Sequence, residues 1–166
     1  NLSPTLGKKI IYTFAGDHGV VSEGVSAYPK EVTPQMVYNF LRDGAAINVL
    51  ARHIGARVVI ADLGVASVIE RHPELRDRKV AMGTHNMAKG PAMSKEEAIR
   101  SIEAGIELVE KELPEGIDIL GTGDMGIGNT TASSAITAAL TGADVAAVTG
   151  RGTGVDDKGW ERKVKV

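Results

Sequence analysis

The sequence predicts an α/β protein in which helices cover both faces of a parallel sheet. Short apolar runs rich in β-branched residues alternate along the 166-residue chain with segments whose apolar residues recur at helical spacing. Strands that alternate with helices in this way form parallel sheets. Glycine-rich stretches follow several of the predicted strands, and the ligands of such sheets bind beyond the carboxyl ends of the strands.

Five segments are predicted to be strands. The runs KKIIYTFAG and ARVVIADLG are apolar, rich in β-branched residues and end in glycine, which is typical of buried strands. The run RKVAMGT is predicted to lie near an edge of the sheet, and IDIL and DVAAVTG follow later in the chain. The five predicted strands are residues 8–16, 56–64, 78–84, 117–120 and 144–150.

A long helix is predicted between the first two strands, over residues 33–55. Thr33 is a favoured N-cap residue and Pro34 suits the first helical position. Gly55 is expected to end the helix. The apolar side chains that recur at helical spacing are Met36, Phe40, Ile47 and Leu50.

Two further helices are predicted. In residues 94–112, Ser94 and Glu97 have the spacing of a capping box, and an apolar stripe follows that we expect to face the core. Residues 130–142 have mostly small side chains and directly follow a glycine-rich stretch. We predict a helix there as well. The predicted stripe consists of Ile99, Ile102, Ile106 and Val109.

The composition is that of a globular protein and argues against several classes of partner. Hydrophobic residues make up 43% of the chain and charged residues 24%. A net charge of −2 and an aromatic content of 4% provide neither a basic face nor a stacking platform for nucleic acid. No apolar run approaches the ~20 residues of a membrane span. We therefore expect no nucleic-acid partner and no membrane association.

The numbers and spacing of cysteine and histidine indicate the cellular compartment of the protein and whether it binds a metal. The chain has no cysteine, which suits a cytoplasmic protein. His53, His72 and His85 stand alone without the spacing of metal ligands, so we expect no metal. We also expect no cofactor. The chain begins at Asn1 without a methionine and stops in the run ERKVKV. A single nucleotide-binding domain over residues 1–166, itself incomplete, is therefore expected.

The stretch GTGDMGIGNTT, residues 121–131, is the strongest local signal of a binding site. Its glycines satisfy G-x-G-x-x-G, but Asp144 begins the next predicted strand, whereas a dinucleotide site needs an acidic residue at the end of that strand. A P-loop would need Lys followed by Ser or Thr where this chain has Asn129 and Thr130. What remains is a row of backbone N–H groups leading into a helix N-terminus, which can bind a phosphate. A second glycine loop, GRGTG, follows at residues 150–154.

Five motifs together resemble the nicotinate-nucleotide–dimethylbenzimidazole phosphoribosyltransferase family. They are GDHGV, GVSAYPKEVTPQMV, DGAAINVLAR, GDMGIGNTT and VTGRGTG, and they occur in the family's order over essentially all of the chain. The resemblance implies the Rossmann-like large domain of that family and an enzyme of cobamide assembly. Such an enzyme moves the phosphoribosyl group of nicotinate mononucleotide to a benzimidazole-type base. The resemblance also implies a homodimer.

The resemblance further implies which residues bind the substrates. The two glycine loops would hold the phosphate and ribose, and residues 25–36, here called the base wall, would pack against the benzimidazole with Gln35 near the base. Asp124 stands where the family often carries glutamate. The expected substrate-binding residues are Asp17, Ser26, Tyr28, Gln35, Asp124, Met125, Gly126, Ile127, Gly128, Asn129, Thr130, Thr131, Gly150, Arg151 and Gly152.

The implied reaction is a displacement at the anomeric carbon of the ribose. A nitrogen of the base attacks, nicotinate leaves, and the attacking base must lose a proton. The family's general base is a glutamate near the C-terminus, which is expected beyond Val166, so no catalytic residue is assigned within this chain. Two alternatives stay open at this point. One is another nucleotide-dependent α/β enzyme such as a dehydrogenase, and the other is a non-catalytic nucleotide-binding fragment.

Overall fold

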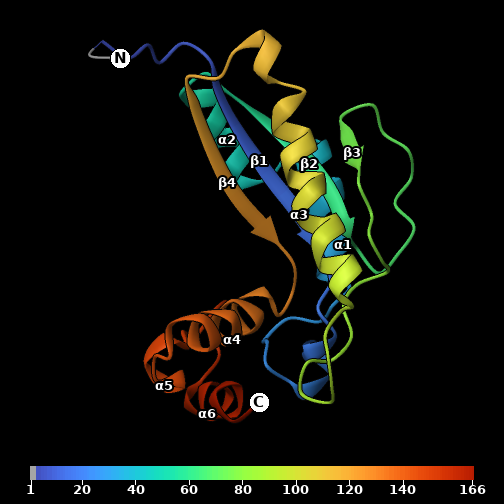
Figure 1. Ribbon diagram of the computed structural model, residues 1–166, viewed down its shortest axis with the longest axis vertical. Helices are drawn as coiled ribbons and strands as arrows, with labels where there is room; N and C mark the ends of the chain where they lie inside the picture. Colours follow the sequence, from blue (N-terminus) through green and yellow to red (C-terminus); the bar gives the residue numbers. More distant parts are fainter. Residues whose placement is uncertain (1–2) are drawn as a thin grey trace.

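The computed structural model of the protein describes residues 3–166 and contains a four-stranded sheet in which every neighbouring pair is parallel. The strands lie in the order β3-β2-β1-β4, so that the first strand of the chain is central. All of their carboxyl ends meet at the lower edge of the sheet in Figure 1. The bounds are β1 Lys9–Gly16, β2 Ala56–Gly64, β3 Leu75–Asp77 and β4 Ile119–Met125.

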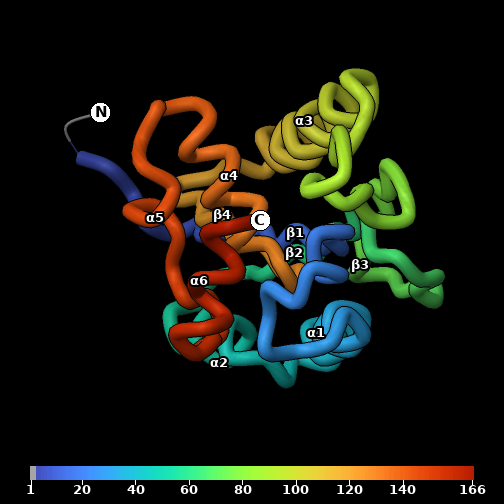
Figure 2. The backbone as a smooth tube through the Cα atoms, turned by 90° about the horizontal axis from the view of Figure 1, so that it is seen from below, coloured from blue at the N-terminus to red at the C-terminus, as the bar shows by residue number. Residues whose placement is uncertain are grey.

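Helices cover both faces of the sheet, which confirms the predicted fold class. Seen along the sheet in Figure 2, α1 (Val32–Leu41) and α2 (Ala46–His53) lie on one side of the strands and α3 (Lys95–Glu110) lies on the other. A second group of helices lies beyond the carboxyl edge (Figure 1), comprising α4 (Asn129–Thr141), α5 (Val145–Val148) and α6 (Asp157–Lys165). Two short 3₁₀ helices, η1 (Gly19–Glu23) and η2 (Leu113–Glu115), complete the described elements.

Each face of the sheet has its own apolar core because side chains alternate along the strands. On the α1 side, Ala15 of β1 and Ile60 of β2 pack with residues of α1 that include Val37 and Phe40. On the α3 side, Tyr12 packs with Ile10, Val59, Ala61 and Leu108. The Tyr12 hydroxyl donates to the carbonyl of Leu108 over 2.9 Å, and burial, followed by the nearby charge of Glu112, raises the pKa of Tyr12.

The single helix predicted over residues 33–55 is wrong, because the structure has two helices there. Asp43 has a positive φ of 57°, a left-handed conformation that ends α1. Asn48 then stabilises the start of α2, since its side-chain oxygen accepts from the N–H of Ala45 and its amide donates to the carbonyl of Phe40. Thr33 lies within α1 and not at its N-cap. Leu50, one of the apolar side chains that recur at helical spacing, is 63% exposed.

Two of the five predicted strands are also wrong. Residues 144–150 contain α5, whose first turn is capped by the Asp144 carboxylate accepting from the N–H of Ala147 over 3.0 Å. Residues 78–84 form no strand; β3 precedes them, and the N–H groups of Arg78 and Val80 donate to carbonyls at the end of β2. Conversely, β4 extends through Met125, so the first glycines of the GTGDMGIGN stretch belong to a strand and not to a loop.

Helix α3 begins as predicted but presents a different face to the sheet. Ser94 accepts from the N–H of Glu97, and Glu97 accepts from the N–H of Ser94, which confirms the capping box. Ala104 and Leu108 are the buried residues of the helix. The side chains predicted to face the core are outside it, since Ile99, Ile102 and Ile106 are 44%, 65% and 51% exposed and only Val109 packs against the core.

A buried ion pair holds the segment after β3 against the end of β2. The carboxylate of Asp62 is 2% exposed and lies 2.7 Å from the ammonium of Lys79. The same carboxylate accepts from the N–H groups of Gly64 and Val65 at 3.0 and 2.9 Å. Asp62 therefore shapes the turn after β2 while Lys79 balances its charge.

We expect Lys79→Met to destabilise the protein by about 3 kcal/mol, because it leaves the Asp62 carboxylate buried without its cation. The measurement is the free energy of unfolding from urea titration. The matched control is Lys89→Met, whose ion pair with Glu23 is 3.6 Å long and 74% exposed on the lysine side. That variant should change stability by less than about 0.5 kcal/mol. Equal effects of the two substitutions would contradict the structural role given to Lys79.

Candidate functional site

The loops that follow β1 and β4 touch at the carboxyl edge, and glycine is needed where they meet. A Cβ atom on Gly126 would lie 2.0 Å from the carbonyl oxygen of Gly16 and 3.1 Å from the imidazole of His18. Gly128 has a positive φ of 87°, and a Cβ there would lie 2.8 Å from Val21. Gly126 is therefore explained by backbone contact between the loops, and Gly128 by its left-handed conformation and the nearby Val21 side chain.

The amides at the start of α4 are mostly engaged within the protein. The N–H of Ile127 donates to the hydroxyl of Thr33 over 3.1 Å, and the N–H of Thr130 donates to the side-chain oxygen of Asn129 over 2.8 Å. The N–H groups of Asn129 and Thr131 donate to carbonyls of the preceding glycines. The expected row of free N–H groups is thus largely occupied, and a different group supplies the positive charge at this helix end.

That group is Lys163 of α6, which the sequence analysis did not identify. Its side chain is buried, with 4% of the residue exposed, and its ammonium donates to the Thr130 hydroxyl over 2.9 Å and to the Gly150 carbonyl over 3.0 Å. Within residues 3–166 no carboxylate forms an ion pair with it. Burial lowers the pKa of Lys163. A buried ammonium without a counter-ion at a helix N-terminus is suited to a bound anion.

The two glycine loops converge on this lysine. Gly150 bonds to it directly, and a Cβ on Gly152 would lie 2.8 Å from the Thr130 hydroxyl and 3.2 Å from the Lys163 ammonium. Arg151 points elsewhere, because its guanidinium pairs with Asp157 and donates to the carbonyl of Val155. The structure therefore places Thr130, Gly150 and Gly152 together and leaves Arg151 outside the group.

The remaining expected residues of the β4 loop lie around the same helix start. Asp124 accepts from the amide of Asn129 over 2.7 Å. Ile127 and Thr131 are buried, and the Thr131 hydroxyl has no hydrogen-bond partner among the described residues. Met125 packs against the core on the α1 side and also lines a cavity described below.

The base wall is joined to these residues through Thr33, and not through the side chains expected to contact the base. Tyr28 is 51% exposed and Gln35 is exposed, and the hydroxyl of Ser26 accepts from the N–H of Tyr28 within the wall itself. The bond from Ile127 to Thr33 and a bond from Arg162 to the Gly24 carbonyl connect the segment to the β4 loop and to α6. The structure does not bring Ser26, Tyr28 or Gln35 into the cavity at this edge.

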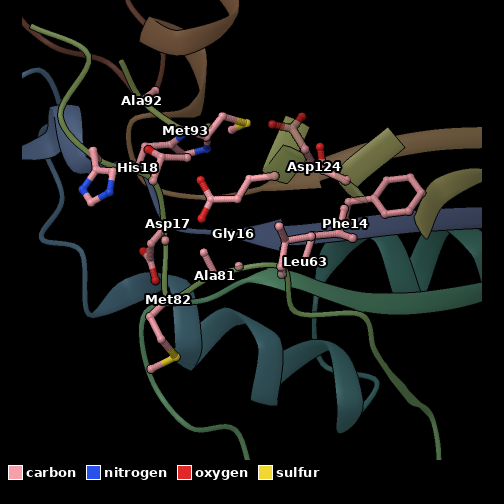
Figure 3. A pocket seen from close by; sticks show the side chains of 18 of the residues that line it. Phe14, Gly16, Asp17, His18, Leu63, Ala81, Met82, Ala92, Met93 and Asp124 are labelled. Carbon is pink, nitrogen blue, oxygen red and sulfur yellow. The ribbon is translucent and has the colours of Figure 1, made fainter. Parts of the chain in front are cut away.

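A cavity of about 410 Å³ lies at the carboxyl ends of β1, β2 and β4, below the start of α3. Its polar side chains include Asp17, His18 and Asp124, and segment 80–93, which the sequence analysis did not connect with a site, forms one wall. In Figure 3 Asp124 and Asp17 lie on different sides of the hollow. Its larger apolar side chains are Phe14, Leu63, Val80, Met82, Met93 and Met125.

His18 sits between the cavity and the glycine loop. Burial lowers its pKa below the ordinary value, although the carboxylates of Asp124 and Asp17 act in the opposite direction. Burial therefore favours the neutral form of the His18 imidazole. Elsewhere among residues 3–166, no cluster of His, Cys, Asp or Glu could hold a metal ion, and no helix of the described chain has both the length and the apolarity to cross a bilayer.

The phosphoribosyltransferase family model matches residues 1–166, and the chain belongs to this family. Its relatives include the nicotinate-nucleotide–dimethylbenzimidazole phosphoribosyltransferases of Geotalea uraniireducens and Geobacter sulfurreducens, which are 61% and 58% identical to it over 166 residues. The match covers all of this chain and 47% of each relative. The chain thus spans about half the length of the curated relatives it matches.

A solved structure shows the same fold. The crystal structure of CobT from Thermus thermophilus superimposes on the chain with a TM-score of 0.94 and 54% sequence identity. The match covers 98% of this chain and 49% of that one. The described sheet and its flanking helices are therefore the fold of this family, as the resemblance of the motifs implied.

Two glycine substitutions test whether the loops after β1 and β4 are in backbone contact. We expect Gly126→Ala to destabilise the protein by more than about 3 kcal/mol, because its Cβ would overlap the Gly16 carbonyl oxygen. Gly150→Ala should change stability by less than about 1 kcal/mol, since no atom lies within 4 Å of the added carbon. Thermal and urea unfolding test both variants. A stable Gly126→Ala protein would show that the two loops are not in contact.

Proposed function

We propose that this chain forms the nucleotide-binding part of a nicotinate-nucleotide–dimethylbenzimidazole phosphoribosyltransferase. The observation that carries the proposal is the buried ammonium of Lys163 between the two glycine loops, which suits the phosphate of a mononucleotide. Relatives of that description, 61% and 58% identical, support the choice of activity. The product would enter the nucleotide loop of cobamides.

The proposal assigns a position to the phosphate, to the ribose and to the acceptor base. The phosphate lies against Lys163, Thr130 and the 150–152 loop, where charge-assisted hydrogen bonds hold it. The ribose lies toward Asp124, and the acceptor base approaches from the base wall. Support for this arrangement comes from the bonds that join the wall, the β4 loop and α6.

The chemistry is a substitution at the anomeric carbon. The bond from that carbon to the pyridinium nitrogen breaks, and its electron pair stays with the nitrogen of the departing nicotinate. The lone pair of a base nitrogen forms the new bond, and the base loses its N–H proton to a general base. Positive charge builds on the ribose in the transition state, as it does in glycoside cleavage. The residues named here bind and orient the nucleotide for this step.

The dehydrogenase alternative receives no support from the structure. Asp144 caps α5, and residues 144–150 form no strand whose end could present an acidic residue to a ribose.

A homodimer remains part of the proposal. It is supported by the apolar stripe of Ile99, Ile102 and Ile106, which lies exposed on α3.

We expect Lys163→Met to weaken nicotinate mononucleotide binding about 10- to 100-fold, the equivalent of one charged hydrogen-bonding partner. Isothermal titration at pH 7.5 measures it. The control is Lys158→Met, an exposed lysine of the same helix, which should bind like the unmodified chain. Equal losses in the two variants would mean that general surface charge, and not the buried ammonium, attracts the nucleotide.

The same lysine predicts a pH dependence. Burial lowers the pKa of Lys163 below its ordinary value, so its charge is lost as pH rises through that lowered value. Phosphate is fully dianionic above about pH 7.5, since its second pKa is about 6. Affinity should therefore fall as pH is raised from 7.5 toward 10 in the unmodified chain. The Lys163→Met variant should show a flat profile, and a flat profile in the unmodified chain would contradict the assignment.

We also propose that the 166-residue chain alone binds the nucleotide without completing the transfer. The chain spans about half of its relatives, and the resemblance places the general base outside it. Loss of a general base costs about 10²–10⁴ in rate, and loss of substrate alignment costs several kcal/mol more. Incubation with nicotinate mononucleotide and dimethylbenzimidazole, followed by chromatography, should show no riboside phosphate. Formation of that product would mean that a carboxylate within the chain, such as Asp17, Glu31 or Asp124, acts as the base.

A further inference from the structure

Hydrogen bonds fix the base wall close to both of its ends. Its middle, residues 27–31, is exposed and belongs to no helix or strand. Toward α1, Thr33 is fully buried and its hydroxyl accepts from the N–H of Ile127 over 3.1 Å. Directly before the wall, the carbonyl of Gly24 accepts from the guanidinium of Arg162 over 3.1 Å. Figure 2 shows the blue segment that leads into α1 running beside α6. The wall therefore spans the distance between the β4 loop and α6.

The backbone at Gly24 is adapted to the contact with Arg162. Gly24 has a positive φ of 69° and ends η1, with its N–H donating to the carbonyl of Val21 over 2.9 Å. A Cβ atom on Gly24 would lie 2.8 Å from Nη1 of Arg162. A side chain at this position would therefore be strained and would also displace the guanidinium. Glycine is needed here both for the turn and for the bond to Arg162.

The two elements that this bond joins are themselves fixed. The amide of Asn86 donates to the hydroxyl of Ser22 in η1 over 2.9 Å. Helix α6 is fixed by the two bonds of Lys163, the residue that directly follows Arg162. Because η1 and α6 are both held by other contacts, the bond from Arg162 to Gly24 sets the direction in which the chain leaves η1 and enters the wall.

No carboxylate competes for the guanidinium of Arg162. Within residues 3–166 it belongs to no ion pair. A hydrogen bond from a charged donor to a carbonyl is stronger than one between neutral groups. The planar guanidinium also loses less conformational freedom for each bond it forms than a lysine ammonium does. The bond to Gly24 is therefore suited to holding a segment that is exposed on its other side.

We propose that Arg162 is a positioning residue for the acceptor base, because it holds the start of the base wall in place. The inference rests on the proposed function, in which the base approaches from this wall and the phosphate lies on Lys163. It adds that α6 serves the two substrates through consecutive residues with separate tasks. Affinity for the base depends on Arg162 and affinity for the nucleotide does not, since Arg162 bonds Gly24 whereas Lys163 bonds Thr130 and Gly150.

Amide hydrogen exchange tests the positioning of the wall without any ligand. We expect Arg162→Met to speed exchange about 10-fold in peptides covering residues 21–33, which include the bonded N–H groups of Gly24 and Val32. Peptides from the sheet should exchange as before. Arg162→Lys keeps a charged donor and should stay within about 3-fold of the unmodified chain. The control is Lys165→Met, an exposed lysine of the same helix, which should leave the wall unchanged. Unchanged exchange of the wall in Arg162→Met, or an equal increase in the sheet, overturns the inference.

A double variant tests whether Arg162 and Gly24 act through each other. Gly24→Ala should speed exchange of residues 21–33 about 10-fold, because its Cβ displaces the guanidinium. In the Arg162→Met background the same substitution should add less than about 3-fold, since the segment that it strains is already released. Two effects that multiply in full would mean that the residues act separately, and would overturn the inference.

Isothermal titration with each substrate then separates positioning of the base from general stability. Arg162→Met should weaken dimethylbenzimidazole binding about 10-fold and nicotinate mononucleotide binding less than about 3-fold, and Arg162→Lys should recover most of the affinity for the base. Loss of structure would weaken both ligands alike, so equal losses overturn the inference, as does an unchanged affinity for the base. Binding of the nucleotide without the base by the unmodified chain overturns the inference and leaves the phosphate site standing. Absence of binding by both ligands overturns the proposed function together with it.

Discussion

Parallel pairing of β1 with β4 brings the loops after these strands into backbone contact, and the whole carboxyl edge depends on that contact. The two strands are far apart in sequence, yet they are paired in register up to Ala15 and Met125. Beyond that point the Gly16 carbonyl occupies the space that a side chain on Gly126 would need. That side chain would also lie 3.1 Å from the imidazole of His18. Any residue with a Cβ at this position would push the loops apart and separate His18 and Asp17 from Asp124.

Helix α6 ties the rest of the site to this edge. Its neighbouring residues Arg162 and Lys163 contact different segments. Arg162 donates to the carbonyl of Gly24, the residue before the base wall, and Lys163 donates to the Thr130 hydroxyl and the Gly150 carbonyl. Trp160 adds a bond from its indole N–H to the Thr149 carbonyl over 2.6 Å. One short helix therefore contacts both the residue before the base wall and the glycine loops.

Some of the buried charged side chains near this edge form ion pairs, and others do not. Lys79 is matched to the buried carboxylate of Asp62 and has a structural role. Lys163 and Asp17, by contrast, are both buried and neither belongs to an ion pair among residues 3–166. Buried charged groups are costly unless they are compensated. Lys163 and Asp17 are two such groups of opposite sign at one edge of the sheet.

The sequence by itself determined the fold class, the family and the segments that gather at the carboxyl edge, because period-two and helical patterns, the Ser94–Glu97 capping box and the glycine motifs are local properties of the chain. Only the tertiary structure decided which parts of those segments meet. The predicted helix over residues 33–55 is two helices separated at Asp43, and the predicted strand over 144–150 contains α5. The side chains of Ile99, Ile102 and Ile106 are exposed and do not pack on the sheet. The tertiary structure also revealed Lys163, whose position in a charged helix has no local signal. A lysine becomes a buried, unpaired cation through what packs around it, and that depends on contacts between residues distant in the chain.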